Sequence, residues 1–557
     1  MEFSKITEAF EKLDQTQKTL EKTDILAELF EESGEQLPQV VLMCTGTPFP
    51  AWKDLDLGVS SKTLVKIISK ATGRSEKEVE KEWKEQGDLG LAAQTMVEKK
   101  TQQRLMSQEI TVQKTFERMQ KVAEMESEGL NSSVNQDKKQ KELADLISSS
   151  EPREAKYLAR IIINNLRLGV GEGTIRDALS EAFFDGKHFE DIQKAYDFSN
   201  DFAEVAKACR EGLEQVNSLE LELYRPVKSM LAKNVDTIEE GFEEVGEPAS
   251  INYKYDGMRA QIHVKEGEVK VFTRRLDDVT EQFPDVVEAV EENIESDNCI
   301  LDTEIVGYDP EDGGMIPFQR LSKRIKRKYD IQKLKEEIPV EVRPFDLIYL
   351  DEPILQRPYS ERWEKLKSVV NEQEEEMKLV DNDITLEAER VQEMQQASLS
   401  DGHEGIMMKN LEAEYKPGNR VGYMVKLKPV METLDLAIVG AKWSEGRRSN
   451  WLGRLFLGCY DKENNEYLEV GKMATGLTDE QFQEITEKLK PLITNEEGRK
   501  VDVRPEVIVE AEYEEIQESP TYSSGYALRF PRMKQFREDK EKADSLEKIK
   551  GLYQDQN

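Results

Sequence analysis

Apolar residues between positions 1 and 218 recur at the three- and four-residue spacing of helices. Leu158, Ile161, Ile162 and Leu166, for example, share one helical face. The pattern predicts an all-helical domain over residues 1–218.

Glycines interrupt this pattern at Gly169, Gly171 and Gly173, and Thr174 then offers an N-cap for a second helix. The stretch is typical of a helix–turn–helix. Backbone N–H groups at the start of the second helix would suit a phosphate group. A plain turn in a helical bundle is the alternative, and the pattern alone leaves both open.

From about Glu222 the chain changes to short runs in which apolar and polar residues alternate, as in half-buried strands. We predict a mixed α/β domain over residues 219–431, with helices at 284–295 and 360–370. The acidic run at 371–378 is interpreted as a solvated helix face. The predicted strands are SINYKYD, AQIHVK, EVKVFTR, CILDTEIVGYD, VEVRPFDLIYLD, EGIMMKN and GYMVKLKP.

A third region, residues 432–557, is rich in strands. It contains LDLAIVGAKW, GRLFLGCYD, EYLEVGKM and EVIVEAEYEEI, with one helix at about 479–489. About five short strands and one helix are typical of a small barrel of the OB type. The expected fold class is therefore multidomain, with an α domain, an α+β domain and a β-barrel in that order.

The charge balance is strongly acidic. The 557 residues include 113 acidic and 78 basic side chains, which give a formal net charge of −35. Such a balance argues against a nucleic-acid partner unless basic residues are gathered locally. They are, because residues 320–328 hold six basic side chains in nine and residues 529–540 hold five against two acidic. We interpret the remaining acidity as adaptation to a salt-rich cytoplasm.

Several kinds of site and location are not expected. The four cysteines are isolated, the three histidines lie in separate contexts, and no GxxxxGK[ST] string occurs. A zinc cluster, a disulfide framework, a Ser-His-Asp triad and a P-loop are therefore poor hypotheses. No apolar run approaches the ~20 residues that span a bilayer, and the first 20 residues are polar, so we expect neither membrane nor secretion but a reducing cytoplasm.

One short string could carry covalent chemistry. Lys254-Tyr255-Asp256-Gly257 follows an apolar strand, and Gly257 would allow a tight turn. A lysine amine becomes a nucleophile when its pKa of about 10.4 is lowered by desolvation or nearby cations. An ordinary surface turn is the competing interpretation of four residues.

Further strings, in order, resolve that ambiguity. They are KYDGMR (254–259), FTRR (272–275), LDTEIVGYD (301–309), PFDLIYLD (344–351), EGIMMK (404–409), VKLK (425–428) and RFPRMKQFREDK (529–540). With them the whole chain resembles the ATP-dependent DNA ligases of the archaeal and eukaryotic replicative type, members of the KxDG nucleotidyltransferase superfamily. The resemblance implies a helical DNA-binding domain, an adenylylation domain with antiparallel sheets and an OB-fold domain.

The resemblance also implies roles for particular residues. Lys254 would take AMP from ATP, Phe345 would stack on adenine, Glu304 would lie at the ribose and the metal, and Glu404 would hold the metal. The cations expected at the ribose and the phosphates are Arg259, Arg274, Arg420, Lys426 and Lys428. Those expected to orient the pyrophosphate from the OB domain are Arg529, Arg532 and Lys540. A linked hypothesis is that Lys426 and the metal lower the pKa of Lys254.

The implied activity is nick sealing through an adenylylated lysine and an adenylylated 5′-phosphate, with release of AMP and pyrophosphate, in replication, repair and recombination. The implied cofactors are ATP and Mg²⁺, with Mn²⁺ as a substitute. The implied partner is nicked double-stranded DNA, contacted by residues 167–176 and by the basic run 320–328. Residues 102–106 stand where relatives carry a sliding-clamp loop but lack its paired aromatics. A monomer is expected.

Three departures from the family pattern stand out. Asn252 replaces a glutamate expected to bind the adenine amino group, so its amide oxygen or the local backbone would do so. Met424 replaces a tryptophan, and Met533-Lys534-Gln535-Phe536 replaces aliphatic residues. One alternative is an RNA ligase or capping guanylyltransferase, which would not need the helical domain. A NAD-dependent ligase is another, but that class needs a four-cysteine zinc site. The last alternative is a non-catalytic scaffold protein.

Overall fold

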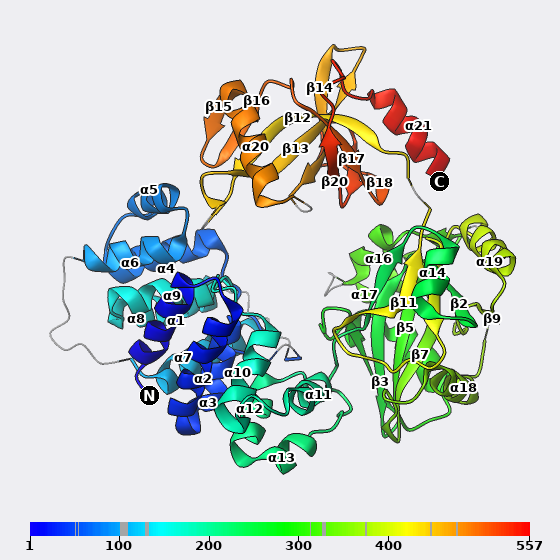
Figure 1. Cartoon of the computed structure of the whole chain (residues 1–557), viewed down its shortest axis with the longest axis horizontal. Coiled ribbons are helices and arrows are strands. Elements are labelled where there is room, and N and C mark those ends of the chain that lie inside the picture. The colour runs from blue at the N-terminus through cyan, green and yellow to red at the C-terminus, as the bar shows by residue number, and fades with distance from the viewer. Residues whose placement is uncertain are drawn as a thin grey trace. The chain divides into compact units, whose positions relative to one another are not determined.

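The computed structural model of the chain describes residues 1–50, 52–53, 55–100, 110–127, 133–311, 313–325, 330–373, 376–429, 431–445, 448–474 and 477–556. Contacts divide the chain into two units, which are described separately (Figure 1). One comprises Met1–Gly73 and Lys100–Pro429, and the other comprises Arg74–Lys99 and Val430–Asn557. The three domain ranges derived from the sequence stay predictions, and residues 102–106 lie outside the described residues.

The N-terminal part of the first unit is helical, as predicted. Leu158, Ile161 and Ile162 are fully buried, in agreement with their expected helical face. The helices are α1 (Phe3–Gln15), α2 (Thr19–Glu32), α3 (Leu37–Thr45), α4 (Ser61–Thr72), α7 (Val112–Ser127), α8 (Ser133–Ser149), α9 (Pro152–Ile162), α10 (Glu172–Phe184), α11 (Phe189–Ser199), α12 (Phe202–Glu211) and α13 (Leu213–Asn217).

The predicted cap of α10 is wrong by three residues. Gly171, in extended backbone, is the N-cap, and its carbonyl accepts the N–H groups of Thr174 and Ile175. Thr174 lies inside the first turn and is buried. The glycine turn itself is confirmed, since Gly169 has a φ of +61°.

The central part of the first unit contains two sheets. The five-stranded sheet has the order β1 (Leu231–Val235), β11 (Arg420–Leu427), β10 (Ile406–Asn410), β2 (Ala249–Tyr253) and β9 (Asn382–Thr385). The six-stranded sheet has the order β4 (Glu268–Thr273), β3 (Met258–Lys265), β5 (Asn298–Tyr308), β7 (Val340–Leu350) and β8 (Glu352–Pro353), with β6 (Met315–Ile316) on β5. All ladders are antiparallel except β1 with β11.

Helices cover these sheets and form their cores. α14 (Ile238–Val245) and α19 (Ala388–Ser400) pack on the five-stranded sheet. α15 (Pro284–Asn293) and α18 (Tyr359–Val369) pack on the six-stranded sheet, close to the predicted bounds. α16 (Phe318–Ile325) and α17 (Ile331–Glu337) follow β6. A further apolar cluster joins the sheets, and Met424, which replaces the expected tryptophan, is buried in it.

The segment before β1 is fixed along β3. The side chain of Gln261 binds both backbone groups of Val227: its Oε1 accepts the N–H at 3.1 Å and its Nε2 donates to the carbonyl at 2.6 Å. Nδ1 of buried His263 accepts the N–H of Tyr224 at 3.0 Å. Two side chains therefore replace the hydrogen bonds that a neighbouring strand would make.

Two charge runs differ from their predicted structure. The described residues of the run at 371–378 form an isolated antiparallel bridge between Gln373 and Met377 instead of a helix, and Met377 is fully buried. In the basic run, Arg324 is buried and binds Asp285 through two hydrogen bonds of 2.7 and 2.8 Å. Arg324 is therefore an internal anchor, and its side chain is not exposed at the surface. Residues 326–329 lie outside the described residues.

The second unit is strand-rich, as expected. Its main sheet has the order β14 (Glu466–Met473), β13 (Leu452–Asp461), β12 (Leu434–Trp443), β16 (Lys500–Val503) and β15 (Ile493–Glu497), and β17 (Ile508–Glu512) joins β12 to β20 (Arg532–Phe536). β18 (Glu515–Glu518) pairs with β19 (Tyr526–Arg529). Its helices are α5 (Glu76–Gln86), α6 (Leu89–Glu98), α20 (Asp479–Leu489) and α21 (Leu546–Gln556). This content fits the OB type, although the ladders of the described strands do not close a barrel.

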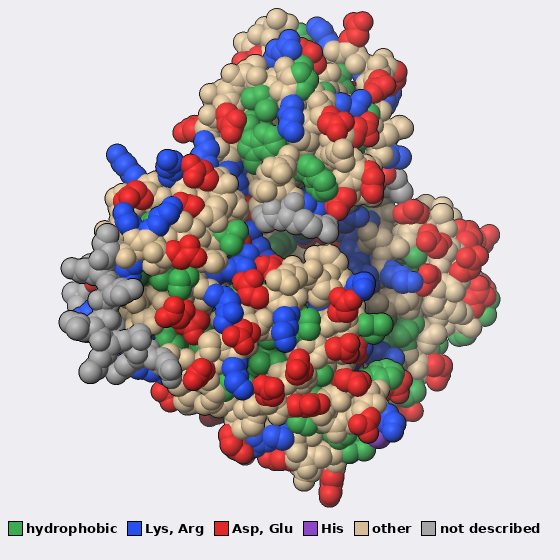
Figure 2. Space-filling view, turned by 60° about the vertical axis from the view of Figure 1, so that its left-hand side comes forward, with side chains coloured by type: hydrophobic (Ala, Val, Ile, Leu, Met, Phe, Trp, Pro, Cys, Tyr) green, Lys and Arg blue, Asp and Glu red, His purple; other side chains and the backbone are tan. Residues whose placement is uncertain are grey.

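The surface is mixed in charge. Acidic and basic side chains alternate over the face drawn in Figure 2, so the acidic excess does not form one block there. Among the described residues, no helix is both long enough and apolar enough to cross a bilayer.

Candidate active site

Lys254 directly follows β2 and is paired with the residues before β10. Its N–H donates to the carbonyl of Gly405 and its carbonyl accepts the N–H of Glu404, both at 2.9 Å. Gly405 has a φ of +132°, and a side chain there would collide with the carbonyl of Leu427. The ladder thus places Lys254 and Glu404 side by side, and the position after Glu404 accepts only glycine.

The Lys254 amine is surrounded by charge. Glu404 forms an ion pair with Lys254 and a second one, of 2.8 Å, with Lys428. Burial lowers the pKa of Lys254, but Glu404 and Glu304 outweigh it and raise the pKa above its ordinary value. For the Glu304 carboxyl group, burial has the opposite effect and raises the pKa to about 8, although Lys254 and Arg259 act to lower it. Without nucleotide, the amine is therefore held as an ammonium ion.

Arginines from both sheets are close enough to influence one another electrostatically. Arg259 on β3 is paired across the ladder with Glu304 on β5. Burial and the charges of Arg259 and Arg420 lower the pKa of Arg274, while Glu304 opposes that shift. The predicted phosphate-binding residues Arg259, Arg274 and Arg420 thus form one cationic cluster, as an anionic ligand would require.

Arg259 is held by a residue that the sequence analysis did not identify. Its Nε and Nη2 donate to the two oxygens of Asp302 at 3.0 and 2.7 Å, and its Nη1 donates to the carbonyl of Met230 at 2.7 Å. Asp302 is fully buried and also accepts from the hydroxyl of Tyr415 at 2.8 Å. A signal was available, since Asp302 is the aspartate of the LDTE string.

The residues expected at the base lie on neighbouring strands. Phe345 on β7 is half-buried, with the guanidinium of Arg259 5.3 Å from its ring centroid. Asn252 on β2 is only 2 % exposed. Its Nδ2 donates to Asn382 at 2.8 Å, and its Oδ1 accepts from Tyr359 at 3.5 Å. The oxygen predicted to bind adenine therefore already has a partner.

The other expected cations differ in position. Lys426 is half-buried on β11, opposite Met407 on β10. The remaining three belong to the second unit and have different partners: Arg529 pairs with Glu515 at 2.9 Å, Lys540 pairs with Asp435 at 3.3 Å, and exposed Arg532 stands opposite Glu512.

The carboxylates beside Lys254 fit a divalent cation that also binds substrate. Glu304 and Glu404 both act electrostatically on the same amine. In the described part of the chain, no group of three or more His, Cys, Asp or Glu side chains could hold a metal by itself. Mg²⁺ commonly takes one or two carboxylates together with phosphate oxygens and water.

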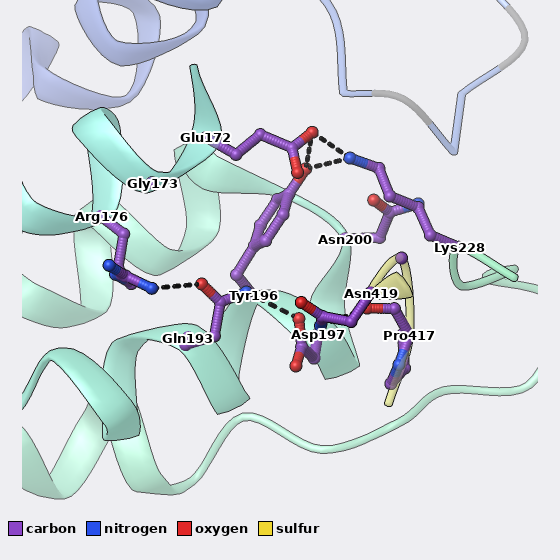
Figure 3. Close-up of a pocket in the computed structure, with 11 residues that line it drawn as sticks. Glu172, Gly173, Arg176, Gln193, Tyr196, Asp197, Asn200, Lys228, Pro417 and Asn419 are labelled. Carbon is purple, nitrogen blue, oxygen red and sulfur yellow. Dashed lines mark hydrogen bonds and ion pairs between the residues drawn. The ribbon is translucent and has the colours of Figure 1, made fainter. Parts of the chain in front are cut away.

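A pocket of about 210 Å³ lies near this site, where the glycine turn of α10 meets the segment before β11 (Figure 3). Lys228 forms an ion pair with Glu172 across it and donates to the hydroxyl of Tyr196 at 3.0 Å. Burial raises the pKa of Asp197 in its wall to about 6. The wall includes Glu172, Gly173 and Arg176 of the predicted DNA-contacting stretch, together with Asn419, the residue before Arg420.

Together, the two-sheet domain and a lysine between carboxylates and arginines define the nucleotidyltransferase class. Three family models match the chain: DNA ligase N terminus over residues 2–180, ATP dependent DNA ligase domain over 229–428, and ATP dependent DNA ligase C terminal region over 448–540. The chain therefore belongs to the ATP-dependent DNA ligase family and is an enzyme that seals nicks in DNA with ATP and a divalent metal.

Curated relatives agree with this assignment, and a solved structure shares the fold. The DNA ligase of Nanoarchaeum equitans is 42 % identical over 100 % of this chain and 98 % of that protein. The DNA ligase of Thermococcus onnurineus is 39 % identical over 100 % and 98 %. The solved structure named Pmar-Lig_PreS3 has a TM-score of 0.62 at 18 % identity, and the match covers 96 % of this chain and 99 % of that one. The N-terminal match favours a DNA ligase over the RNA ligase and capping enzyme considered above.

Proposed function

We propose that Lys254 is the residue that carries AMP. Its neutral amine attacks the α-phosphorus of ATP, a P–N bond forms, and pyrophosphate leaves. The DNA 5′-phosphate oxygen then displaces the lysine nitrogen from that phosphorus, and the 3′-hydroxyl finally displaces AMP to form the phosphodiester. The observation that carries the proposal is the position of this amine between the two sheets, bounded by Glu404 and Glu304.

The charges around Lys254 divide this work. Arg259, Arg274 and Arg420 neutralise the phosphate oxygens on which negative charge increases as pyrophosphate leaves. Glu404 and Glu304 would hold Mg²⁺, or Mn²⁺ in its place, and the metal would neutralise phosphate charge. Because Glu404 would then coordinate the metal, its ion pair with the Lys254 ammonium would weaken, and Lys254 would lose its proton more readily. Lys428, which pairs with Glu404, adds positive charge beside Lys254, and Lys426 would contact the phosphates.

The base and the leaving group involve the remaining residues. Phe345 would stack on adenine, a contact worth about 1–3 kcal/mol per base. Asn252 would recognise the base through its backbone, since its side chain already bonds to Asn382. The second unit would supply Arg529, Arg532 and Lys540 to the pyrophosphate.

The partner proposed for this enzyme is a nicked duplex, bound mainly through its backbone. Residues 167–176 would contact it, because three of them line a pocket together with Asn419, which precedes Arg420 in the chain. We retain the monomer, the sliding clamp as a partner through residues 102–106, and the cytoplasm as proposals. The four free cysteines, all buried, are compatible with a reducing compartment.

Incubation with α-labelled ATP and Mg²⁺ tests the central step. The wild-type protein and a Lys265→Ala control, in which an exposed lysine of the same domain is removed, should retain label through denaturation. Lys254→Ala should retain none and should not seal a nicked duplex with ATP. Label retained by Lys254→Ala would refute the proposal.

A further inference from the structure

A second buried lysine lies at the base side of the site. Lys409 on β10 is only 5 % exposed. Its Nζ lies 3.4 Å from the carbonyl oxygen of Phe345 and 3.4 Å from the hydroxyl of Tyr359. Among the described residues, no carboxylate forms an ion pair with it, which is unusual for a buried lysine.

Aromatic rings take the place of that carboxylate. The Lys409 Nζ lies 4.9 Å from the ring centroid of Phe345 and 4.6 Å from that of Tyr359. Both distances are within the range of a cation–π contact, which strengthens when water is excluded. Burial lowers the pKa of Lys409 to about 8, while Asp346 and Asp302 oppose that shift.

These contacts join Phe345 to the rest of the base site. Tyr359 binds Lys409 and also lies 3.5 Å from Oδ1 of Asn252. One polar chain thus runs from Asn252 through Tyr359 and Lys409 to the backbone of Phe345. A buried lysine held only for core packing could be replaced by methionine, which fills a similar volume without the cost of burying a charge.

We propose that Lys409 is a positioning residue that fixes the Phe345 ring for stacking on the nucleotide base. This rests on the proposed function, because it assumes that adenine stacks on Phe345. Lys409 acts on the ring from the protein side through its charge and through its hydrogen bond to the backbone of Phe345. Its loss should weaken ATP binding and leave the chemical step almost unchanged.

The test is the rate of self-adenylylation without DNA, measured against ATP concentration. Lys409→Met should raise the KM for ATP about five- to tenfold, in keeping with the loss of a buried cation–π contact. The kcat should change less than twofold, and Lys409→Arg should restore most of the affinity. Lys22→Met is the matched control, because Lys22 is also buried and donates to a carbonyl, that of Leu168, at 2.6 Å.

A double-mutant cycle separates positioning from general destabilisation. If Lys409 acts through the ring, Lys409→Met should have little further effect on the KM in a Phe345→Leu background. An equal effect in both backgrounds, or an unchanged KM in Lys409→Met alone, would overturn the inference. Labelling at saturating ATP tests the proposed function independently. Under that condition Lys254→Ala should remain unlabelled, whereas Lys409→Met should still become labelled.

Discussion

The carboxylate of Glu404 forms an ion pair with the amine of Lys254, the residue proposed to attack ATP. The same carboxylate also binds Lys428, so one oxygen is shared by two ammonium groups. An amine in such a pair cannot attack phosphorus until its proton leaves. Self-adenylylation is therefore coupled to whatever draws Glu404 away from Lys254.

Replacing Glu404 should change the pH dependence of the first step. The neutral fraction of an amine rises tenfold per pH unit below its pKa, and Glu404 raises the pKa of Lys254. Glu404→Gln should therefore shift the rising limb of the pH–rate profile to lower pH, even if the lost metal ligand slows the reaction at every pH. Label incorporation at saturating ATP and Mg²⁺ measures this. The prediction would be contradicted if the rising limb of the Glu404→Gln profile stayed at the wild-type pH. It would also be contradicted if Glu412→Gln, at an exposed site, shifted the limb equally.

Asp302→Asn should destabilise the central domain. Asp302 is fully buried against Arg259, and removal of one member of a buried pair costs about 3–5 kcal/mol. Arg259 would also lose its orientation, so the KM for ATP should rise. The shift of the urea midpoint measures the stability. Asp278→Asn breaks a half-exposed 3.6 Å ion pair with Lys270 and should lower the free energy of unfolding by less than about 1 kcal/mol. Equal losses of stability in the two variants would refute the role of Asp302 as the buried partner of Arg259.

Arg324 and Lys323 should behave differently despite their adjacent positions. Arg324→Gln leaves Asp285 without its buried partner and should cost about 3–5 kcal/mol, without changing the salt dependence of DNA binding. Lys323 is exposed, and Lys323→Gln should lower the slope of log K against log salt by about one if it contacts a phosphate. A changed slope in Arg324→Gln would mean that its side chain reaches DNA.

Glu172→Gln should tighten DNA binding at low salt. Glu172 pairs with Lys228 beside the glycine turn, and the substitution releases that lysine for a phosphate. Affinity should rise several-fold, with a steeper salt slope by about one. Glu190→Gln removes an equal charge at an exposed position of α11 and should change affinity less. Binding unchanged in Glu172→Gln would exclude Lys228 from the DNA interface.

Nick sealing should continue at salt concentrations that stop ligases of balanced charge. The prediction follows from the net charge of −35, which suits a salt-rich host. Activity of this enzyme and of a less acidic family member, measured side by side across a salt series, tests it. Strong inhibition of this enzyme by modest salt would rule out the adaptation.

The sequence predicted most elements because local patterns determine them. α20 has the predicted bounds, since Thr478 and Gln481 form a capping box at its start. Seven strands of the two central sheets were predicted from short runs rich in apolar residues, whereas the short strands β1, β6, β8 and β9 were not predicted. Thr174 was mistaken for a cap because its residue type suits that position, whereas Gly171 occupies it through backbone conformation alone.

The site was predicted less completely, because charged residues look alike until they are folded. Arg324 appeared to belong to a DNA-binding run, yet its partner Asp285 is 39 positions away. Lys409 and Asp302 lie within the motif strings, but their roles depend on contacts with rings and arginines from other strands. Spacing along one strand cannot show such contacts.

The side-chain attachment of the segment before β1 matters for engineering. Gln261 and His263 belong to β3, whereas the backbone that they bind, at Val227 and Tyr224, leads in from the helices. A chimaera that joins the helical half of another ligase to this catalytic half would keep Gln261 and His263. The segment before β1 that these side chains bind would then come from the other ligase. The crossover is therefore best placed upstream of Tyr224, so that the side chains and the backbone that form these hydrogen bonds come from the same parent protein.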